Sequence, residues 1–112
     1  MVGIFLSYIL LDKNFKRVYH SNMHLNELAK IMRIVGDESR LKILCFIFNH
    51  KEFCVSAIAQ ELDMSVAIAS HHLQVMAKQG LVIPVRNGRN ICYQLVKDNF
   101  MKDLKKFVCK YK

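Results

Sequence analysis

The chain has 112 residues, of which 53% are hydrophobic. This length predicts one domain with a modest core, and this composition excludes an intrinsically disordered chain. Lysine and arginine outnumber aspartate and glutamate by 17 to 9, giving a formal net charge of +8. A compact domain this basic favours a polyanionic partner, with nucleic acid ahead of an anionic membrane surface. The alternative is a basic protein without such a partner.

Residues 1–22 begin with the apolar stretch MVGIFLSYILL. At about ten residues the stretch is too short to span a membrane. It has neither a preceding basic residue nor a small-residue cleavage site, so it is a poor signal peptide and no membrane partner is expected. We therefore treat residues 1–22 as an N-terminal extension of unknown role. Its apolar residues would need cover from a dimer partner or the last helix, unless translation begins at Met23.

Two helices are predicted next. The first ends at Gly36, and its apolar residues keep helical spacing: Leu25, Leu28, Ile31, Met32 and Val35. Asp37 is a candidate N-cap for the second helix. The apolar face of that helix consists of Leu41, Leu44, Cys45 and Phe48.

A helix–turn–helix pattern follows in the sequence. VSAIAQELD predicts a short helix, and Asp63 is expected to take a left-handed turn conformation. Ser65 is the expected N-cap of a helix over residues 66–79, and Gly80 is its stop signal.

The apolar spacing then changes from helical to strand-like. LVIPVR and NICYQLV predict two strands joined at NGR by a two- or three-residue turn of the Asn-Gly kind. Pro84 lacks an N–H, so its strand is expected at an edge. Residues 97–112 return to helix, with these residues expected to face inward: Phe100, Met101, Leu104, Phe107 and Val108. Residues 23–112 therefore predict a mainly α fold with a small β-hairpin, the winged helix–turn–helix.

In this fold the second helix of the helix–turn–helix enters the DNA major groove. Ser70, His71 and Gln74 lie in that helix, and Gln can pair with adenine through two hydrogen bonds. Basic residues at the hairpin tip suit phosphate or minor-groove contact. The predicted DNA-binding residues are Ser65, Ser70, His71, Gln74, Lys78, Arg86, Asn87 and Arg89.

A metal site at His71 and His72 is the competing interpretation of the same helix. Adjacent helical residues point about 100° apart, so the two rings cannot readily close on one ion. We expect His72 instead to pack or hydrogen-bond against the first helices while His71 faces the groove. The sequence also lacks a Gly-rich phosphate loop and convincing paired carboxylates, so we expect neither an enzyme nor a cofactor.

The four cysteines are Cys45, Cys54, Cys92 and Cys109. They form no C-x-x-C pair and are scattered through helix and strand patterns. This scattering is typical of reduced thiols in a cytoplasmic protein. Cys92 is expected to be a packing residue of the second wing strand.

Four motifs, DESRLKILCFI, VSAIAQELDMS, ASHHLQVMAKQGLV and NGRNICYQL, resemble the ArsR/SmtB family of winged-helix repressors. The resemblance spans residues 25–108. It implies a homodimer, joined mainly through the first and last helices, that represses an operator until an effector releases it. The chain departs from the family at Asp63, where Gly is usual, and at Ala67 and Ile68, where Ser and Thr are common. A winged-helix interaction module that has lost DNA binding is therefore the alternative.

Metal-sensing members of the family carry two kinds of ligand set, and neither is complete here. EFCVSA resembles the E-L-C-V-C set but has Ser56 as its second member, which leaves Cys54 alone. In the last helix Phe100, two residues after Asp98, stands where the first His of the other ligand set would be. Tyr111 falls where the second His would be. We expect no metal site, with a thiophilic metalloid held partly by Cys54 as the alternative.

The persulfide-sensing, BigR-like members offer a closer match. They carry one cysteine in R-L-x-I-L-C and another near the end of the last helix. This chain has Cys45 in RLKILC and Cys109 in FVCKYK. The resemblance therefore implies a thiol sensor at Cys45 and Cys109 that responds to reactive sulfur or an oxidant. Inert core cysteines are the alternative.

Overall fold

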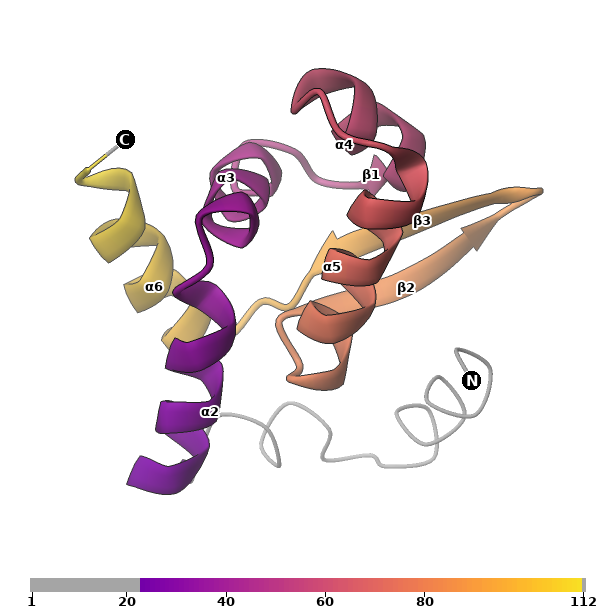
Figure 1. The fold of residues 1–112 in the computed structure, drawn as a ribbon. Coiled ribbons are helices and arrows are strands. Elements are labelled where there is room, and N and C mark those ends of the chain that lie inside the picture. The colour runs from indigo at the N-terminus through magenta and orange to yellow at the C-terminus, as the bar shows by residue number, and fades with distance from the viewer. Residues whose placement is uncertain (1–22, 112) are drawn as a thin grey trace.

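The computed structural model describes residues 23–111 (Figure 1). Five helices and three short strands follow one another over this range. In chain order they are α2 (Leu25–Val35), α3 (Glu38–Ile47), β1 (Phe53–Cys54), α4 (Val55–Glu61), α5 (Val66–Lys78), β2 (Val82–Asn87), β3 (Asn90–Leu95) and α6 (Asn99–Cys109). This is the predicted winged helix–turn–helix, with α4 and α5 as the helix–turn–helix and β2–β3 as the wing. The predicted extension, residues 1–22, lies outside the described residues.

Local side-chain hydrogen bonds set the starts of three helices. The Asp37 carboxylate accepts from the backbone N–H of Arg40 at 3.0 Å, which caps α3. The Ser65 hydroxyl accepts from the N–H of Ile68 at 3.1 Å and caps α5. Both caps were predicted, and Asp98 caps α6 in the same way. Each bond satisfies one of the backbone donors that the first turn of a helix leaves unpaired.

The turn between α4 and α5 depends on a left-handed residue, as predicted. Asp63 has a φ of 54° and is the single non-glycine residue with a positive φ among residues 23–111. This turn brings α4 and α5 together over side chains that have no exposed surface, including Ile58, Ala69 and Leu73. The hydrophobic core therefore joins the two helices of the helix–turn–helix directly.

Within residues 23–111 the sheet has three strands in the order β1-β3-β2, all antiparallel. The β2 strand is an edge, as Pro84 predicted. The β1 strand was missed because two residues, Phe53 and Cys54, are too few to show an alternating pattern. It pairs with the far side of β3, so the predicted hairpin is part of a slightly larger sheet.

The wing turn differs from the Asn-Gly type that was expected. Asn87 pairs with Asn90 as the last strand residues, so the two-residue loop is Gly88–Arg89. Gly88 has a φ of 63°, whereas Arg89 does not have a positive φ. Glycine at the first loop position is the requirement of a type II′ turn.

The packing of α6 corrects one sequence prediction. Met101 and Leu104 are buried, and Phe100 and Val108 are half-buried. Phe107, predicted to face inward, has 63% of its surface exposed in the single chain. It packs edge-on against Tyr111, which is also exposed, with 5.6 Å between ring centroids. Two aromatic side chains thus lie outside the core. Within residues 23–111, no helix is long and apolar enough to cross a membrane.

Candidate nucleic-acid interface

The α5 helix has one face in the core and the opposite face in solvent. Leu73 and Met76 have no exposed surface, and Ala69 and Ala77 are also buried. His71, Gln74 and Lys78 are exposed on the other side. Because the apolar face is fully packed, the backbone of α5 holds these polar side chains at a fixed place on the surface.

Two of the predicted base-reading residues lie in contact with each other. The Gln74 side-chain amide donates to the Ser70 hydroxyl at 3.2 Å, across one turn of α5. His71 is exposed beside them, and its ring centroid lies 6.0 Å from that of His72. The structure therefore brings Ser70, His71 and Gln74 into one polar cluster, and Lys78 continues it one turn later.

His72 does not belong to this polar cluster. Its Nδ1 accepts a hydrogen bond from Nε of Arg40 on α3 at 3.1 Å, which agrees with the expected contact to the first helices. Arg40 also donates to the backbone carbonyl of Ile34 on α2 at 3.2 Å. Arg40, on α3, is thus a positioning residue that connects α5 to α3 and α2. Its role had no sequence signal, since it lies 32 residues from His72.

Burial and charge act on the titration of this contact. Burial of the ring, and then the charge of Arg40, lower the pKa of His72 below its ordinary value of 6.5. The backbone N–H of Arg40 lowers the pKa of Asp37. His72 is therefore held in the neutral form that can accept the Arg40 hydrogen bond.

Apolar side chains at the start of α5 were not predicted as part of the site. Val66 and Ile68 have 55% and 52% of their surfaces exposed. The sequence signal for Ile68 was its departure from the Ser or Thr that is common at this position in the family. An exposed apolar side chain in a major groove can contact the methyl group of thymine. Ser65 also lies here, exposed, but its hydroxyl is engaged as the helix cap.

The three predicted wing residues occupy the tip of the β2–β3 hairpin. Arg86, Asn87 and Arg89 are all exposed. The hairpin projects beyond the helices, as Figure 1 shows. This geometry presents two guanidinium groups on a narrow extension, which suits contact with the phosphates or the minor groove of a duplex.

The predicted thiol-sensor residues are free, half-buried cysteines on two helices that contact each other. Cys45 lies on α3 and lines an open groove with Glu61 and Leu62 at the end of α4. Cys109 is the last residue of α6 and packs against the core. The α3 and α6 helices are in contact, but the two thiols are not bonded.

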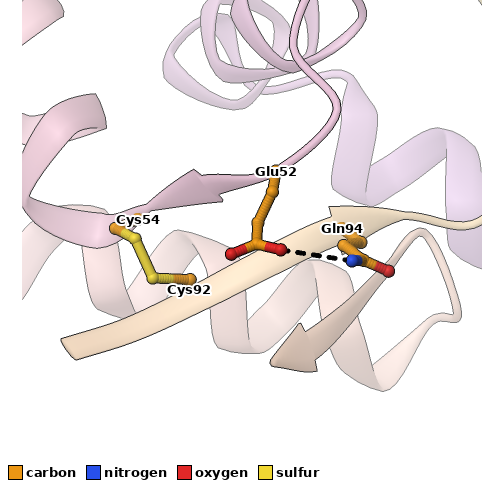
Figure 2. The surroundings of a disulfide bond; sticks show 4 residues. All are labelled: Glu52, Cys54, Cys92 and Gln94. Atoms are coloured by element: carbon orange, nitrogen blue, oxygen red, sulfur yellow. Dashed lines mark hydrogen bonds between the residues drawn. A yellow bond between two sulfur atoms is a disulfide. The ribbon is translucent and has the colours of Figure 1, made fainter. Parts of the chain in front are cut away.

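The other two cysteines correct the prediction that all thiols are reduced. Cys54 and Cys92 form a disulfide that joins β1 to β3 (Figure 2). The strand register places them directly opposite each other, which the sequence could not show because β1 was not predicted. Cys92 is therefore a bonded residue as well as a buried one. Among the described residues 23–111, no group of three or more potential metal ligands lies close enough to hold an ion.

The sequence of this chain is similar to those of known bacterial regulators. The family described as bacterial regulatory protein, arsR family, matches residues 37–83, from the cap of α3 into β2. The arsenical resistance operon repressor of Staphylococcus xylosus is 32% identical over 73 residues, which cover 65% of this chain and 69% of that protein. The chain belongs to the ArsR family.

Another relative of this ArsR-family chain is longer. The cadmium resistance transcriptional regulatory protein CadC of Listeria innocua is 34% identical over 85 residues. These cover 76% of this chain and 66% of that protein, so the chain spans slightly less than two thirds of this relative. Both relatives are transcriptional regulators, which agrees with the prediction that the chain is not an enzyme.

Solved structures show the same fold for the ArsR-family chain. One is the homodimeric winged helix–turn–helix DNA-binding domain of a possible ArsR-family transcriptional regulator from Mycobacterium bovis. It aligns with a TM-score of 0.63 at 23% identity, covering 89% of this chain and 82% of that domain. The predicted family and fold are thus confirmed.

Proposed function

We propose that this ArsR-family chain is a homodimeric transcriptional repressor that binds double-stranded operator DNA through α5 and the wing. One observation carries the proposal. In the Ser70–His71–Gln74 cluster on α5, His71 and Gln74 are exposed and Ser70 is half-buried, while the buried face of that helix and the His72–Arg40 bond fix its position. A rigid helix with exposed hydrogen-bonding groups is what major-groove reading requires.

The wing and the overall charge support the same proposal. Arg86 and Arg89 extend the basic surface beyond α5, and the chain carries a net charge of +8. In this proposal the α5 cluster reads bases, whereas Lys78 and the wing bind mainly the phosphate backbone. Ser65 contributes as the N-cap that stabilises the first turn of α5, the end of the helix that would enter the groove.

Dimerisation would use α2 and α6, as the family resemblance implies. Leu25 and Met32 on α2 are exposed, as are Phe107 on α6 and Tyr111 just after it. Isolated exposed apolar residues are common on monomers, but these four lie on, or directly after, the two helices that the resemblance assigns to the interface. A second copy of the chain would bury them and set the spacing of the two α5 helices.

Operator selection from a random duplex library tests the proposal, because it needs no known target. Single His71→Ala and Gln74→Ala variants are then measured on the selected duplex and on unselected duplex. A lost base contact should cost about 1–3 kcal/mol, or about 5- to 150-fold in Kd, on the selected duplex alone. Lys105→Gln, on an exposed position of α6, is the control variant.

Two outcomes would contradict this proposal. If selection enriches no sequence, the chain is not an operator-binding protein and the interaction-module alternative gains support. If His71→Ala and Gln74→Ala weaken both duplexes equally, the α5 cluster does not read bases.

For the effector, we propose reactive sulfur acting on Cys45 and Cys109. A Cys45 thiolate would take the outer sulfur of a persulfide RSSH and release RSH. Attack of Cys109 on the Cys45 persulfide would then form a disulfide and release hydrogen sulfide. Both cysteines are free thiols on contacting helices, which supports the assignment. The new bond would pull α6 toward α3 and shift the dimer away from its DNA-binding geometry.

Glutathione persulfide added to the protein–DNA complex tests this assignment. The Cys45→Ser and Cys109→Ser variants should bind the selected duplex as the unmodified chain does, yet remain bound after treatment. Normal release of either variant would remove that cysteine from the mechanism.

A metal or metalloid response is the second candidate, favoured by the cadmium and arsenical relatives. In this chain Cys54 could serve only while its bond to Cys92 is reduced. Arsenite added to fully reduced protein on the selected duplex separates the two candidates. Release that persists in Cys45→Ser but fails in Cys54→Ser would favour the metalloid candidate.

A further inference from the structure

The Cys54–Cys92 pair connects two parts of the DNA-binding unit that are far apart in the sequence. Cys54 is the last residue of β1 and the N-cap residue of α4, the first helix of the helix–turn–helix. Cys92 lies within β3, the inner strand of the wing. The two residues are 38 positions apart. A bond between them therefore links the wing to the start of the helix–turn–helix.

The antiparallel register places the two cysteines next to each other once β1 forms. Residues directly opposite each other in an antiparallel ladder point to the same face of the sheet. Cys54 is directly opposite Cys92 in this ladder, and the two sulfur atoms are bonded. The next pair, Phe53 and Tyr93, points the other way into the hydrophobic core. The cysteines thus occupy the outer face of the sheet.

Access to the two sulfur atoms is unequal. Cys54 is half-buried on β1, which is an edge strand, whereas Cys92 has no exposed surface. Beside them on the same face, the Gln94 amide donates to the exposed Glu52 carboxylate at 3.3 Å (Figure 2). A reagent from solvent therefore meets Cys54 first, with Cys92 beneath it as the second thiol.

We propose that Cys54 and Cys92 are a reversible thiol–disulfide couple that exchanges with low-molecular-weight disulfides of the glutathione or cystine type. The Cys54 thiolate attacks a disulfide RSSR, forms a mixed disulfide and releases RSH. Cys92 then attacks the Cys54 sulfur, closes the protein disulfide and releases the second RSH. Two protein thiols are oxidised, one RSSR is reduced to two RSH, and the thiol protons leave on the products.

The two states differ in how firmly the wing is held. The β1 strand has only two residues, so its ladder with β3 is the shortest in the sheet. In the reduced state that short ladder and the packing of Phe53 and Tyr93 hold the wing strand beside α4. In the oxidised state a covalent bond adds to them, which slows local opening of the hairpin. This inference concerns the chain's own thiols and does not rest on operator binding.

Peptide mapping tests the couple directly, because cleavage sites separate the four cysteines in the sequence. Cleavage after lysine and arginine places each cysteine on a different peptide, with Cys54 on residues 52–78 and Cys92 on residues 90–97. The full-length protein is equilibrated without oxygen in buffers of reduced and oxidised glutathione, then acid-quenched and alkylated. We expect the two peptides to become linked and unlinked together as the glutathione ratio changes, without denaturant.

The Cys45→Ser/Cys109→Ser double variant keeps the couple and isolates its signal. In this variant oxidation should lower the protein mass by two hydrogen atoms, with no glutathione attached at the end point. Cys92→Ser is the matched variant that cannot close the bond, so Cys54 should instead retain one glutathione. A circular dichroism spectrum establishes whether Cys92→Ser is folded, and the double variant alone decides the question if it is not.

Three outcomes would overturn the couple. Cys54 and Cys92 could stay fully alkylated in oxidised glutathione, or end as separate glutathione adducts in the double variant. The linked pair could also resist reduced glutathione until the chain is denatured, which would make it a purely structural bond. For the wing, we expect amide hydrogen exchange in β3 to be slower in the disulfide form by about tenfold or more. Equal exchange in both forms would overturn the holding role.

Discussion

Helices α5 and α6 both place one face in the core, but they leave different kinds of side chain in solvent. The exposed side of α5 carries the polar cluster at His71 and Gln74, and the helix is tied to α3 through His72. At the end of α6, Phe107 and the adjacent Tyr111 are exposed at 63% and 75%. The apolar face of α5 is thus mostly covered within one chain, whereas residues 23–111 leave the aromatic side chains at the end of α6 exposed.

This difference separates two requirements of the proposed repressor. A helix that reads DNA needs a fixed backbone and exposed hydrogen-bonding groups, which intrachain packing supplies. A helix that joins two protomers needs exposed apolar surface, which becomes buried only when the second chain arrives. Mutations on the two helices should therefore affect different measurements.

The largest effect is expected from Phe107→Glu. A carboxylate in a dimer interface would lose its hydration, and loss of the aromatic ring would remove an apolar side chain from that interface. We expect the dimer dissociation constant to rise by about thirtyfold or more, equivalent to about 2 kcal/mol, by analytical ultracentrifugation. DNA affinity should fall with it, although no α5 residue has changed.

The control for Phe107→Glu is Lys105→Gln, which lowers the net charge by the same one unit. Lys105 lies two residues away, about 200° around α6, and is exposed. It should leave the dimer intact. A dimer that tolerates Phe107→Glu as well would show that α6 does not form the interface.

An intermediate effect is expected from the wing. If Arg86 and Arg89 each neutralise one phosphate, replacing either with Gln should make the slope of log K against log salt shallower by about 0.9. Affinity should fall by a similar factor on selected and random duplex, because phosphates carry no direct sequence information. A slope unchanged from that of the Lys105→Gln control would place the wing away from DNA.

The smallest effect is a pH dependence of stability that comes from His72. Because its pKa is lowered in the folded chain, the unfolded chain takes up the proton at a higher pH. The free energy of unfolding should therefore fall as the pH drops below 6.5, and should level off below the lowered pKa of the folded state. Protonation of Nδ1 would also remove the acceptor that Arg40 uses.

Denaturant unfolding at a series of pH values measures this effect. His72→Gln has no proton to gain in this range, so its stability should vary less with pH than that of the unmodified chain. His71→Gln removes a neighbouring, exposed imidazole and should keep most of the dependence, because the charge of His71 is the last of the causes that lower the pKa of His72. Identical pH profiles for the two variants would remove His72 as the source. Asp37 does not contribute to the change that begins near pH 6.5, because its own pKa is lowered from 3.8.

Local signals predicted most of the fold and the exposed part of the candidate site. Caps at Asp37 and Ser65 act over three residues, and the left-handed Asp63 acts within one turn. The helix over residues 66–79 was therefore placed to within one residue of α5 (Val66–Lys78). Helical spacing also indicated which side of α5 faces solvent, which put His71 and Gln74 on the surface.

The burial of Phe107 was the exception among the helical predictions. Its position fits the apolar face of an isolated amphipathic helix, but the core of one chain ends at Leu104 and the half-buried Val108. Periodicity identifies an apolar side chain without saying which chain covers it. The same ambiguity applies to Leu25 on α2, which is 83% exposed.

The sequence alone thus determined the helix–turn–helix, its caps and its exposed polar cluster, because each depends on residues within one or two turns. Tertiary structure decided the Arg40–His72 bond, the β1–β3 register and the Cys54–Cys92 disulfide. The first and last of these join residues 32 and 38 positions apart, and the Glu52–Gln94 bond beside the disulfide joins residues 42 positions apart. Contacts at that separation depend on how whole elements pack, and no short sequence pattern encodes them.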